Sequence, residues 1–187
     1  PGVGGTCLSK DPYIYSNPII KKNLDIKLGQ VSREINDKGG EYVYSKINHF
    51  SKLIKKPINA LNILIVGIAF KGEPETSDSR GSISLDLLNK LKKSNNISIK
   101  DYVISNKDLL TFGCKVIKKP VGKVVKNYDA LIYMNNHRKN IEEDVLINLR
   151  YIKKPFLFFD GWNMFNPKEV ESIDHVIYST MGYFSKK

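Results

Sequence analysis

The chain has few cysteines and few histidines. Its 187 residues include two cysteines, Cys7 and Cys114, and three histidines, His49, His137 and His175. Two cysteines outside any C-x-x-C pair are too few for a disulfide framework, so a reducing compartment, the cytoplasm, is the default expectation. The histidines are far apart and have no partner at metal-ligand spacing, so we expect no zinc site.

Long apolar runs are also missing. The longest, Ile63–Val66 and Phe156–Phe159, fall well short of the roughly 20 residues that a membrane-spanning helix needs. No signal peptide is visible, and we expect no membrane partner. The segment Gly67–Gly72 superficially resembles a phosphate-binding loop. The lysine and hydroxyl that should follow the second glycine are absent, which argues against ATP hydrolysis.

Acidic residues are fewer than basic ones. The chain has 30 Lys and Arg against 19 Asp and Glu, a formal net charge of +11. No long basic block, zinc-finger spacing or RNP-like aromatic segment is present, so we expect no specific nucleic-acid binding. A basic field also attracts diphosphates and dinucleotides, and the high lysine content can equally reflect genome base composition. The lysines stand in short pairs: Lys21-Lys22, Lys55-Lys56, Lys92-Lys93, Lys118-Lys119 and Lys153-Lys154.

Two helical stripes are predicted in the first third of the chain. Apolar residues recur at steps of three and four from Ile20 to Ile35, the period of an amphipathic helix. Gly39 and Gly40 are expected to interrupt it, and a second stripe follows until Pro57 stops it. The stripes are interpreted either as an interface or as faces that pack on their own domain. Their members are Ile20, Leu24, Leu28, Val31, Ile35, Val43, Ile47, Phe50 and Ile54.

After Pro57 predicted strands alternate with predicted helices. This pattern indicates an α/β fold with a parallel sheet covered by helices on both faces. The strands are expected at Asn62–Val66, Ser98–Ser105, Lys115–Lys118, Ala130–Met134, Phe156–Asp160 and His175–Tyr178. The first helix is expected at Ser82–Lys92. The segments that can serve as further crossovers lie near Asn106–Phe112, Val121–Asn127, Ile141–Leu149 and Pro167–Glu171.

Ligands of such sheets bind outside the carboxyl ends of the strands. Phe70-Lys71, Asn135–His137 and Gly161–Asn163 follow three of the predicted strands, and Asp78–Arg80 precedes a predicted helix. Lys71 offers a compact phosphate donor and Arg80 a forked one. Either could instead be an exposed cation without a ligand.

The first fifteen residues place one cysteine behind three glycines. Glycines let the backbone pass close to a ligand, and Lys10 favours the thiolate form of Cys7. Asp11 can manage a proton or a water molecule. The segment therefore suits a nucleophile, although a buried structural cysteine beside a glycine turn remains an equal alternative on spacing alone.

Three segments together resemble the UDP-glucose/GDP-mannose dehydrogenase family, the nucleotide-sugar 6-dehydrogenases. Pro1–Pro12 is similar to that family's active-site cysteine segment. Ile65–Lys71 followed by Asp78–Arg80 looks like the strand, lysine and D-x-R turn that open its C-terminal domain. Phe159–Asn163 is similar to its Asp-Gly-Arg-Asn turn.

The resemblance implies a division of the chain. Residues 1–57 would hold the active-site cysteine loop and a central helical segment that makes a homodimer, and residues 58–187 a Rossmann-like nucleotide-sugar-binding domain. The family's NAD-binding domain carries a G-x-G-x-x-G turn between its first strand and helix, and no turn of that kind occurs here. We therefore expect a C-terminal fragment without its N-terminal NAD-binding domain, inactive alone.

The resemblance also implies a reaction and roles for the first residues. The C6 alcohol of a UDP-sugar would be oxidised to the acid by two NAD molecules in turn, through a thiohemiacetal and a thioester on Cys7. Asp11 would assist proton handling, and Lys10 would lie near the cofactor phosphates. Val3 and Gly4 would line the sugar pocket through their backbone.

Further roles fall on the α/β part. By resemblance, Lys71 would hold the nucleotide-sugar diphosphate and Arg80 would reach the NAD pyrophosphate, although the loop between them is longer than the family pattern. Trp162 stands where an arginine commonly contacts the substrate, and an indole stacks on rings but cannot pair with phosphate. Thr6 departs from the UDP-N-acetylhexosamine enzymes, whereas Asp11–Tyr13 is similar to them, so we favour a UDP-N-acetylhexosamine.

Two other functions remain open at this point. The chain could be a non-catalytic module that binds nucleotide sugars, with saturable binding and no NADH formation. It could also be a basic scaffold for nucleic acid, with salt-sensitive retention on DNA.

Overall fold

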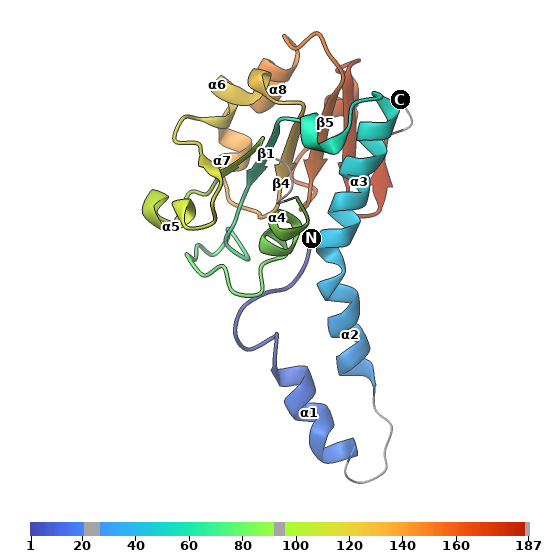
Figure 1. Ribbon diagram of the computed structural model, residues 1–187, viewed down its shortest axis with the longest axis vertical. Helices are drawn as coiled ribbons and strands as arrows, with labels where there is room; N and C mark the ends of the chain where they lie inside the picture. The colour runs from blue at the N-terminus through green and yellow to red at the C-terminus, as the bar shows by residue number, and fades with distance from the viewer. Residues whose placement is uncertain (21–26, 92–95, 186–187) are drawn as a thin grey trace.

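The computed structural model describes residues 1–20, 27–91 and 96–185, without the side chains of residues 16–20. In these ranges the chain forms a seven-stranded sheet with the order β3-β2-β1-β4-β5-β6-β7 (Figure 1). Its first six strands are parallel, and β7 is antiparallel to β6. The strands are β1 (Ile63–Val66), β2 (Ile97–Lys100), β3 (Lys115–Val116), β4 (Ala130–Tyr133), β5 (Phe156–Asp160), β6 (Val176–Thr180) and β7 (Tyr183–Phe184).

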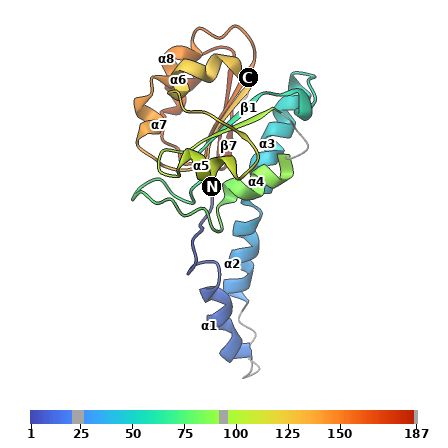
Figure 2. The same cartoon turned by 60° about the vertical axis from the view of Figure 1, so that its left-hand side comes forward.

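Helices cover both faces of this sheet, as the continuous apolar runs of its strands require. All residues of β1, β4, β5 and β6 are buried. One core lies under α3 and α4, and the other under the helices from α6 to α9 (Figure 2). The helices are α1 (Asp11–Ile20), α2 (Leu28–Asp37), α3 (Gly39–Leu53), α4 (Ile83–Leu91), α5 (Asn106–Leu110), α6 (Val121–Val124), α7 (Lys139–Glu142), α8 (Val145–Leu149) and α9 (Pro167–Glu171), with 3-10 turns at Ile58–Ala60 and Val125–Asn127.

The α/β fold and all six predicted strands are confirmed, with changes at their ends. The strand expected at Ser98–Ser105 ends at Lys100, because the next residue, Asp101, turns the chain by accepting hydrogen bonds from Val103 and Ile104. The crossover segment predicted near Ile141–Leu149 contains two short helices, and Asp144 between them has a φ of 51°. The antiparallel strand β7 was not predicted.

Helices α1 and α2 form a stalk that projects from the α/β part of the chain (Figure 1). Leu28, Val31 and Ile35 lie on α2, whereas Ile20, predicted on the same helix, is the last residue of α1. Residues 21–26, with Leu24, lie outside the described residues. The predicted interruption of the helical pattern is present, but it falls at Lys38 and not at Gly39 and Gly40. Helix α2 ends at Asp37, and both glycines belong to the first turn of α3.

These two glycines are needed for close packing. A Cβ atom on Gly40 would lie 2.1 Å from Oδ2 of Asp86 on α4, and one on Gly39 would lie 2.9 Å from the Pro1 carbonyl. Both distances are shorter than real Cβ contacts allow. The pair therefore lets α3 approach α4 and the start of the chain.

Three neighbouring strands, β1, β4 and β5, end at the same edge of the sheet. The first residues of the chain run past this edge: a Cβ atom on Gly161, directly after β5, would meet the ring of Pro1 at 2.9 Å. None of the helices in the described ranges has the length and apolar character to cross a membrane.

Candidate functional site

Phe70 and Lys71 lie in the loop that follows β1. The backbone N–H of Phe70 donates to the carbonyl of Asp78 across the loop, at 3.0 Å. The Lys71 Nζ lies 5.5 Å from the centre of the Phe70 ring, within range of a cation–π interaction. Lys71 is half-buried and forms no ion pair with any acidic side chain of the described ranges, so its charge remains available for an anionic ligand.

A buried carboxylate positions the backbone just before Phe70. The Oδ2 atom of Asp101 accepts from the N–H groups of Ile68 and Ala69 at 2.8 and 3.0 Å, and its Oδ1 accepts from Val103 and Ile104 at 2.8 and 3.0 Å. Four donors satisfy this carboxylate fully. Sequence reasoning missed Asp101, and its position directly after a buried strand was the signal that could have found it.

The loop after β4 holds the segment that follows Lys71. Oδ1 of Asn136 accepts from the N–H groups of Gly72 and Glu73, at 2.9 and 3.0 Å. His137 is buried, stacks on the ring of Tyr102 at 4.6 Å, and places Nε2 3.0 Å from Oε1 of Glu75. Because Nδ1 of His137 accepts from a backbone N–H, the proton sits on Nε2 and is donated to Glu75. These residues, singled out from the sequence as a strand-end segment, therefore hold the Lys71 loop.

The cysteine segment is seated on Phe70. A Cβ atom on Gly4 would lie 2.7 Å from the Phe70 Cβ and 2.7 Å from the carbonyl of Gly81. Gly5 has a φ of 92°, which favours glycine, and its N–H donates to the carbonyl of Arg80 at 3.0 Å. Phe70 thus connects the predicted cysteine loop to the predicted diphosphate lysine, a contact that the sequence motifs do not show.

Helix α2 holds the other side of this segment through Val3. The N–H of Val3 donates to Oδ1 of Asn36 at 2.7 Å, and its carbonyl accepts from Asn36 and Arg33, both at 3.1 Å. Arg33 is buried and also donates to Asp37 at 2.5 Å. The side chain of Val3 is exposed, so its backbone is fixed while its side chain faces outwards.

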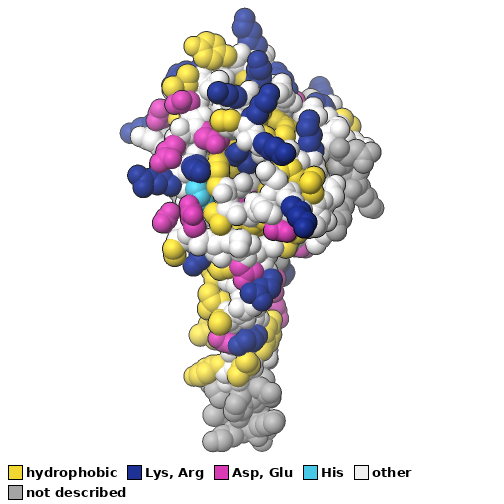
Figure 3. Space-filling model, turned by 90° about the vertical axis from the view of Figure 1, so that its left-hand side faces the viewer, with side chains coloured by type: hydrophobic (Ala, Val, Ile, Leu, Met, Phe, Trp, Pro, Cys, Tyr) yellow, Lys and Arg dark blue, Asp and Glu magenta, His cyan; other side chains and the backbone are white. Residues whose placement is uncertain are grey.

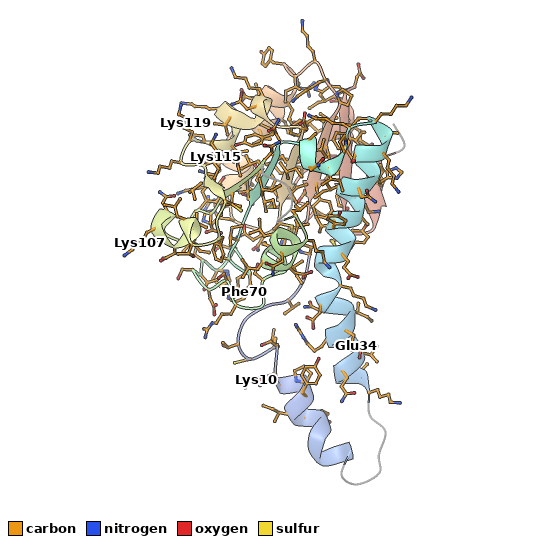
Figure 4. The ribbon with its side chains drawn as sticks, in the orientation of Figure 1. Lys10, Glu34, Phe70, Lys107, Lys115 and Lys119 are labelled. Carbon is orange, nitrogen blue, oxygen red and sulfur yellow. The ribbon has the colours of Figure 1, made fainter. Side chains whose placement is uncertain are left out.

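Cys7 is exposed, and its thiol is free. The carbonyl of Cys7 accepts hydrogen bonds from the N–H groups of Lys10 and of Asp11, the first residue of α1. The side chains of Lys10 and Asp11 pair with each other at 2.5 Å, and this hydrogen bond raises the pKa of Lys10. The structure therefore brings the three residues into one turn, with Lys10 directed to Asp11. Figure 4 shows Lys10 at the top of the stalk, below Phe70.

Arg80 is exposed and paired with its neighbour Asp78. The two guanidinium nitrogens Nε and Nη2 donate to Oδ1 and Oδ2 of Asp78 at 2.9 and 2.8 Å. The hydrogen bond from Arg80 lowers the pKa of Asp78 to about 2. The guanidinium is thus committed to a carboxylate within its own turn, and contact with a pyrophosphate requires that it exchange one anion for another.

Trp162 follows β5 and is held by two hydrogen bonds. Its backbone N–H donates to Oδ1 of the buried Asp160 at 3.1 Å, and its indole Nε1 donates to the carbonyl of Met134 at 3.2 Å. The side chain is 39% exposed. Since the indole N–H is already used, Trp162 presents a ring face and no polar donor.

Within the described residues, no cluster of three or more His, Cys, Asp or Glu side chains is arranged to hold a metal ion. The chemical groups at the edge are instead one exposed thiol, a lysine over an aromatic ring, and backbone groups of a glycine segment. This sheet and this edge define the class of the protein: a Rossmann-like α/β domain with a cysteine segment placed against the carboxyl edge of its parallel strands.

The UDP-binding domain of the UDP-glucose/GDP-mannose dehydrogenase family matches residues 64–167. The chain belongs to this family, and the resemblance predicted from the sequence is confirmed. UDP-N-acetyl-D-mannosamine dehydrogenase of Methanococcus maripaludis is 34% identical over 188 residues, which cover 100% of this chain and 39% of that protein. The enzyme of the same name from Methanocaldococcus jannaschii is 27% identical over 180 residues, which cover 95% of this chain and 38% of that protein. The chain therefore spans about two-fifths of these relatives.

Solved structures show the same fold. A UDP-D-ManNAc dehydrogenase from Pyrococcus horikoshii superposes with a TM-score of 0.75 at 22% identity, over 97% of this chain and 39% of that one. An NDP-N-acetyl-D-galactosaminuronic acid dehydrogenase from Methanosarcina mazei superposes with a TM-score of 0.75 at 20% identity, over 98% of this chain and 39% of that one. At these identities the similarity concerns the fold alone.

Proposed function

We propose that this chain is the cysteine-bearing C-terminal part of an NAD-dependent dehydrogenase that oxidises the C6 alcohol of a UDP-sugar to the acid. The observation that carries the proposal is the contact of the cysteine segment with Phe70, next to Lys71. This contact places the segment that carries the exposed thiol of Cys7 against the residue next to Lys71, which has no acidic partner among the described residues. The family membership supports the same assignment.

In this mechanism Cys7 acts on the aldehyde that the first oxidation produces. The thiol sulfur adds to the carbonyl carbon, and the thiol proton goes to the former carbonyl oxygen, which gives a thiohemiacetal. Loss of a hydride from carbon and of the hydroxyl proton leaves a thioester. Water then cleaves the C–S bond, releasing the acid and restoring the thiol. Covalent capture keeps the aldehyde oriented for the second hydride transfer.

The other residues of the segment bind and orient. The backbone of Val3 and Gly4, fixed by α2 and by Phe70, lines the sugar pocket. Asp11 handles the proton of the attacking water. Lys71 binds the diphosphate, and Trp162 stacks its ring face on the base or the sugar, because its N–H is occupied.

NAD supplies the hydride acceptor for both oxidations when it is bound. Lys10 and Arg80 would contact its phosphates. Both side chains are more than half exposed and pair with a carboxylate of their own turn. Asp11 is itself exposed, and Asp78 would keep the hydrogen bond from the backbone N–H of Arg80 if the guanidinium moved to a phosphate. Lys10 and Arg80 are therefore suited to bind the phosphates of a dinucleotide.

We further propose UDP-N-acetyl-D-mannosamine as the sugar. The relatives that carry this name match most or all of the chain, in agreement with the UDP-N-acetylhexosamine preference inferred from Asp11–Tyr13. A homodimer through the central helices is part of the same proposal. Leu28 and Ile35 on α2 are 76% and 69% exposed, and Figure 3 shows hydrophobic side chains exposed along the stalk.

The test uses the chain extended upstream through its natural reading frame. We expect about two NADH per molecule of UDP-N-acetyl-D-mannosamine, and fewer or none from UDP-glucose or GDP-mannose. Cys7→Ala is expected to abolish acid formation, because no thiohemiacetal can form. Cys114→Ala is the matched control, since Cys114 packs against the core under α3 and α4. Normal acid yield from Cys7→Ala would remove Cys7 from the mechanism.

A second candidate is a non-catalytic nucleotide-sugar-binding module. It is favoured by the match of the UDP-binding domain to residues 64–167. If the chain is such a module, we expect saturable UDP binding that Lys71→Ala weakens. We also expect that the extended, folded protein forms no NADH from any nucleotide sugar.

A further inference from the structure

A cavity lies along the outer strands β2 and β3 and reaches the amino edge of the sheet, away from the candidate site. It encloses about 620 Å³, within the roughly 300–1,000 Å³ of small-molecule sites. Three of its residues, Asn62, Asn96 and Tyr128, stand near the amino ends of β1, β2 and β4. The full lining is Asn62, Asn96, Ile97, Ser98, Lys115, Val116, Ile117, Lys118, Lys119, Val124, Asn127 and Tyr128.

The cavity exists because the helix layer is short above β2. Ser98 pairs in register with Leu64 of the core under α6 to α9, so both side chains belong to the same face of the sheet. Helix α6 contains four residues and β3 two, too few to cover that face out to its edge. The small side chain of Ser98 leaves space, and Val124 and Tyr128 form an apolar wall beside it.

The charge around this space is of one sign. Lys115, Lys118 and Lys119 line it and are exposed, and none of them forms an ion pair with an acidic side chain in the described ranges. No aspartate or glutamate of those ranges lines the cavity. The neighbouring Asp129 is already neutralised by Lys56 and Lys154, at 2.7 and 2.8 Å. Figure 3, which faces this edge, shows Lys and Arg side chains gathered over the upper part of the α/β domain.

We propose that this cavity binds a small phosphorylated anion of up to nucleotide size. The three lysines would neutralise its phosphates as charge-assisted donors. The side chains of Asn62 and Asn127 would hydrogen-bond its polar groups, and the Val124–Tyr128 wall would contact an apolar portion. This site is independent of the proposed dehydrogenase function, because it shares no lining residue with the edge that carries Lys71 and Cys7.

The test is a titration of the whole chain with inorganic pyrophosphate, followed by amide NMR shifts in low salt. We expect saturable shifts at Ile97 and from Lys115 to Lys119. The double variant Lys115→Glu, Lys119→Glu should weaken this binding at least about tenfold, since it removes two charge-assisted donors. Lys71→Ala should leave these shifts unchanged, which separates the cavity from the candidate active site.

The control is a double variant with the same change in net charge, Lys107→Glu with Lys168→Glu. Both lysines are exposed and lie outside the cavity lining. Figure 4 shows Lys107 below Lys115 and Lys119, on α5. The control should bind pyrophosphate within about twofold of the unchanged chain. Equal weakening in both double variants, or pyrophosphate shifts that do not saturate at Lys115 to Lys119, would overturn the proposal.

Discussion

At the scale of single residues, Asp101 determines the geometry of the Lys71 loop, although no motif includes it. Its two carboxylate oxygens receive four backbone N–H groups from two loops. An asparagine at this position would keep one oxygen acceptor and turn an NH₂ group towards two buried donors.

We therefore expect Asp101→Asn to lower the free energy of unfolding by about 2–3 kcal/mol, because two buried donors lose their partner. Urea denaturation of the chain measures this. Asp174→Asn is the matched control, since Asp174 is exposed, and it should shift the stability by less than about 0.5 kcal/mol. Equal stability of the two variants would show that the Asp101 bonds contribute little.

The sequence identified candidate site residues but could not orient their side chains. Lys10, Lys71, Arg80 and Trp162 were identified from short motifs. Their directions depend on partners that a motif does not specify: Asp11 for Lys10, Asp78 for Arg80, and the Met134 carbonyl for Trp162. The last of these comes from a different strand end, a contact that only the folded sheet creates.

At the scale of helices and strands, burial explains which predictions succeeded. Strands with continuous apolar runs, such as β1 and β5, were placed nearly to the residue because both of their faces are covered. The two-residue β7 carries no such signal. Gly39 and Gly40 were predicted to break the helical pattern, and the break falls at Lys38, directly before them. The reason for glycine at these two positions is contact with residues distant in sequence, Pro1 for Gly39 and Asp86 for Gly40. Close packing between elements is not visible in local periodicity.

The exposed face of α2 gives a prediction at this scale. We expect the chain to dimerise, and Leu28→Glu with Ile35→Glu to raise the dissociation constant of the dimer at least about tenfold, because two charges would enter an apolar contact. Sedimentation equilibrium measures it. Glu34→Lys, a charge change at an exposed residue of the same helix (Figure 4), should leave dimerisation nearly unchanged. A chain that stays monomeric at every concentration would contradict the expected interface.

At the scale of the whole molecule, Asp129 ties separate parts of the chain to the amino edge of the sheet. It accepts from Lys56 after α3, from Lys154 before β5, and from the N–H of Asn62 before β1. Burial alone would raise its pKa, but these hydrogen bonds hold the pKa at about 2, below its ordinary value of 3.8.

A folded-state pKa below the unfolded value stabilises the protein above the unfolded pKa, and this contribution is lost as pH falls through the folded pKa. We expect Asp129→Asn to be less stable by about 1–2 kcal/mol above pH 5, reduced from the full linkage value because both lysines are partly exposed. The difference should shrink between about pH 5 and pH 2. Thermal unfolding of both proteins across this range checks it, and a pH-independent difference would assign the effect to packing.

The hydrogen bonds between α2 and the backbone of Val3 have a consequence for the proposed reaction. Asn36 and Arg33 fix both backbone groups of Val3, so the cysteine segment takes its position from a helix whose other face is apolar and exposed. If two copies meet through that face, the position of the proposed nucleophile, Cys7, depends on dimer formation and so on protein concentration. Under the proposed function, turnover per subunit would then fall on dilution below the dissociation constant of the dimer.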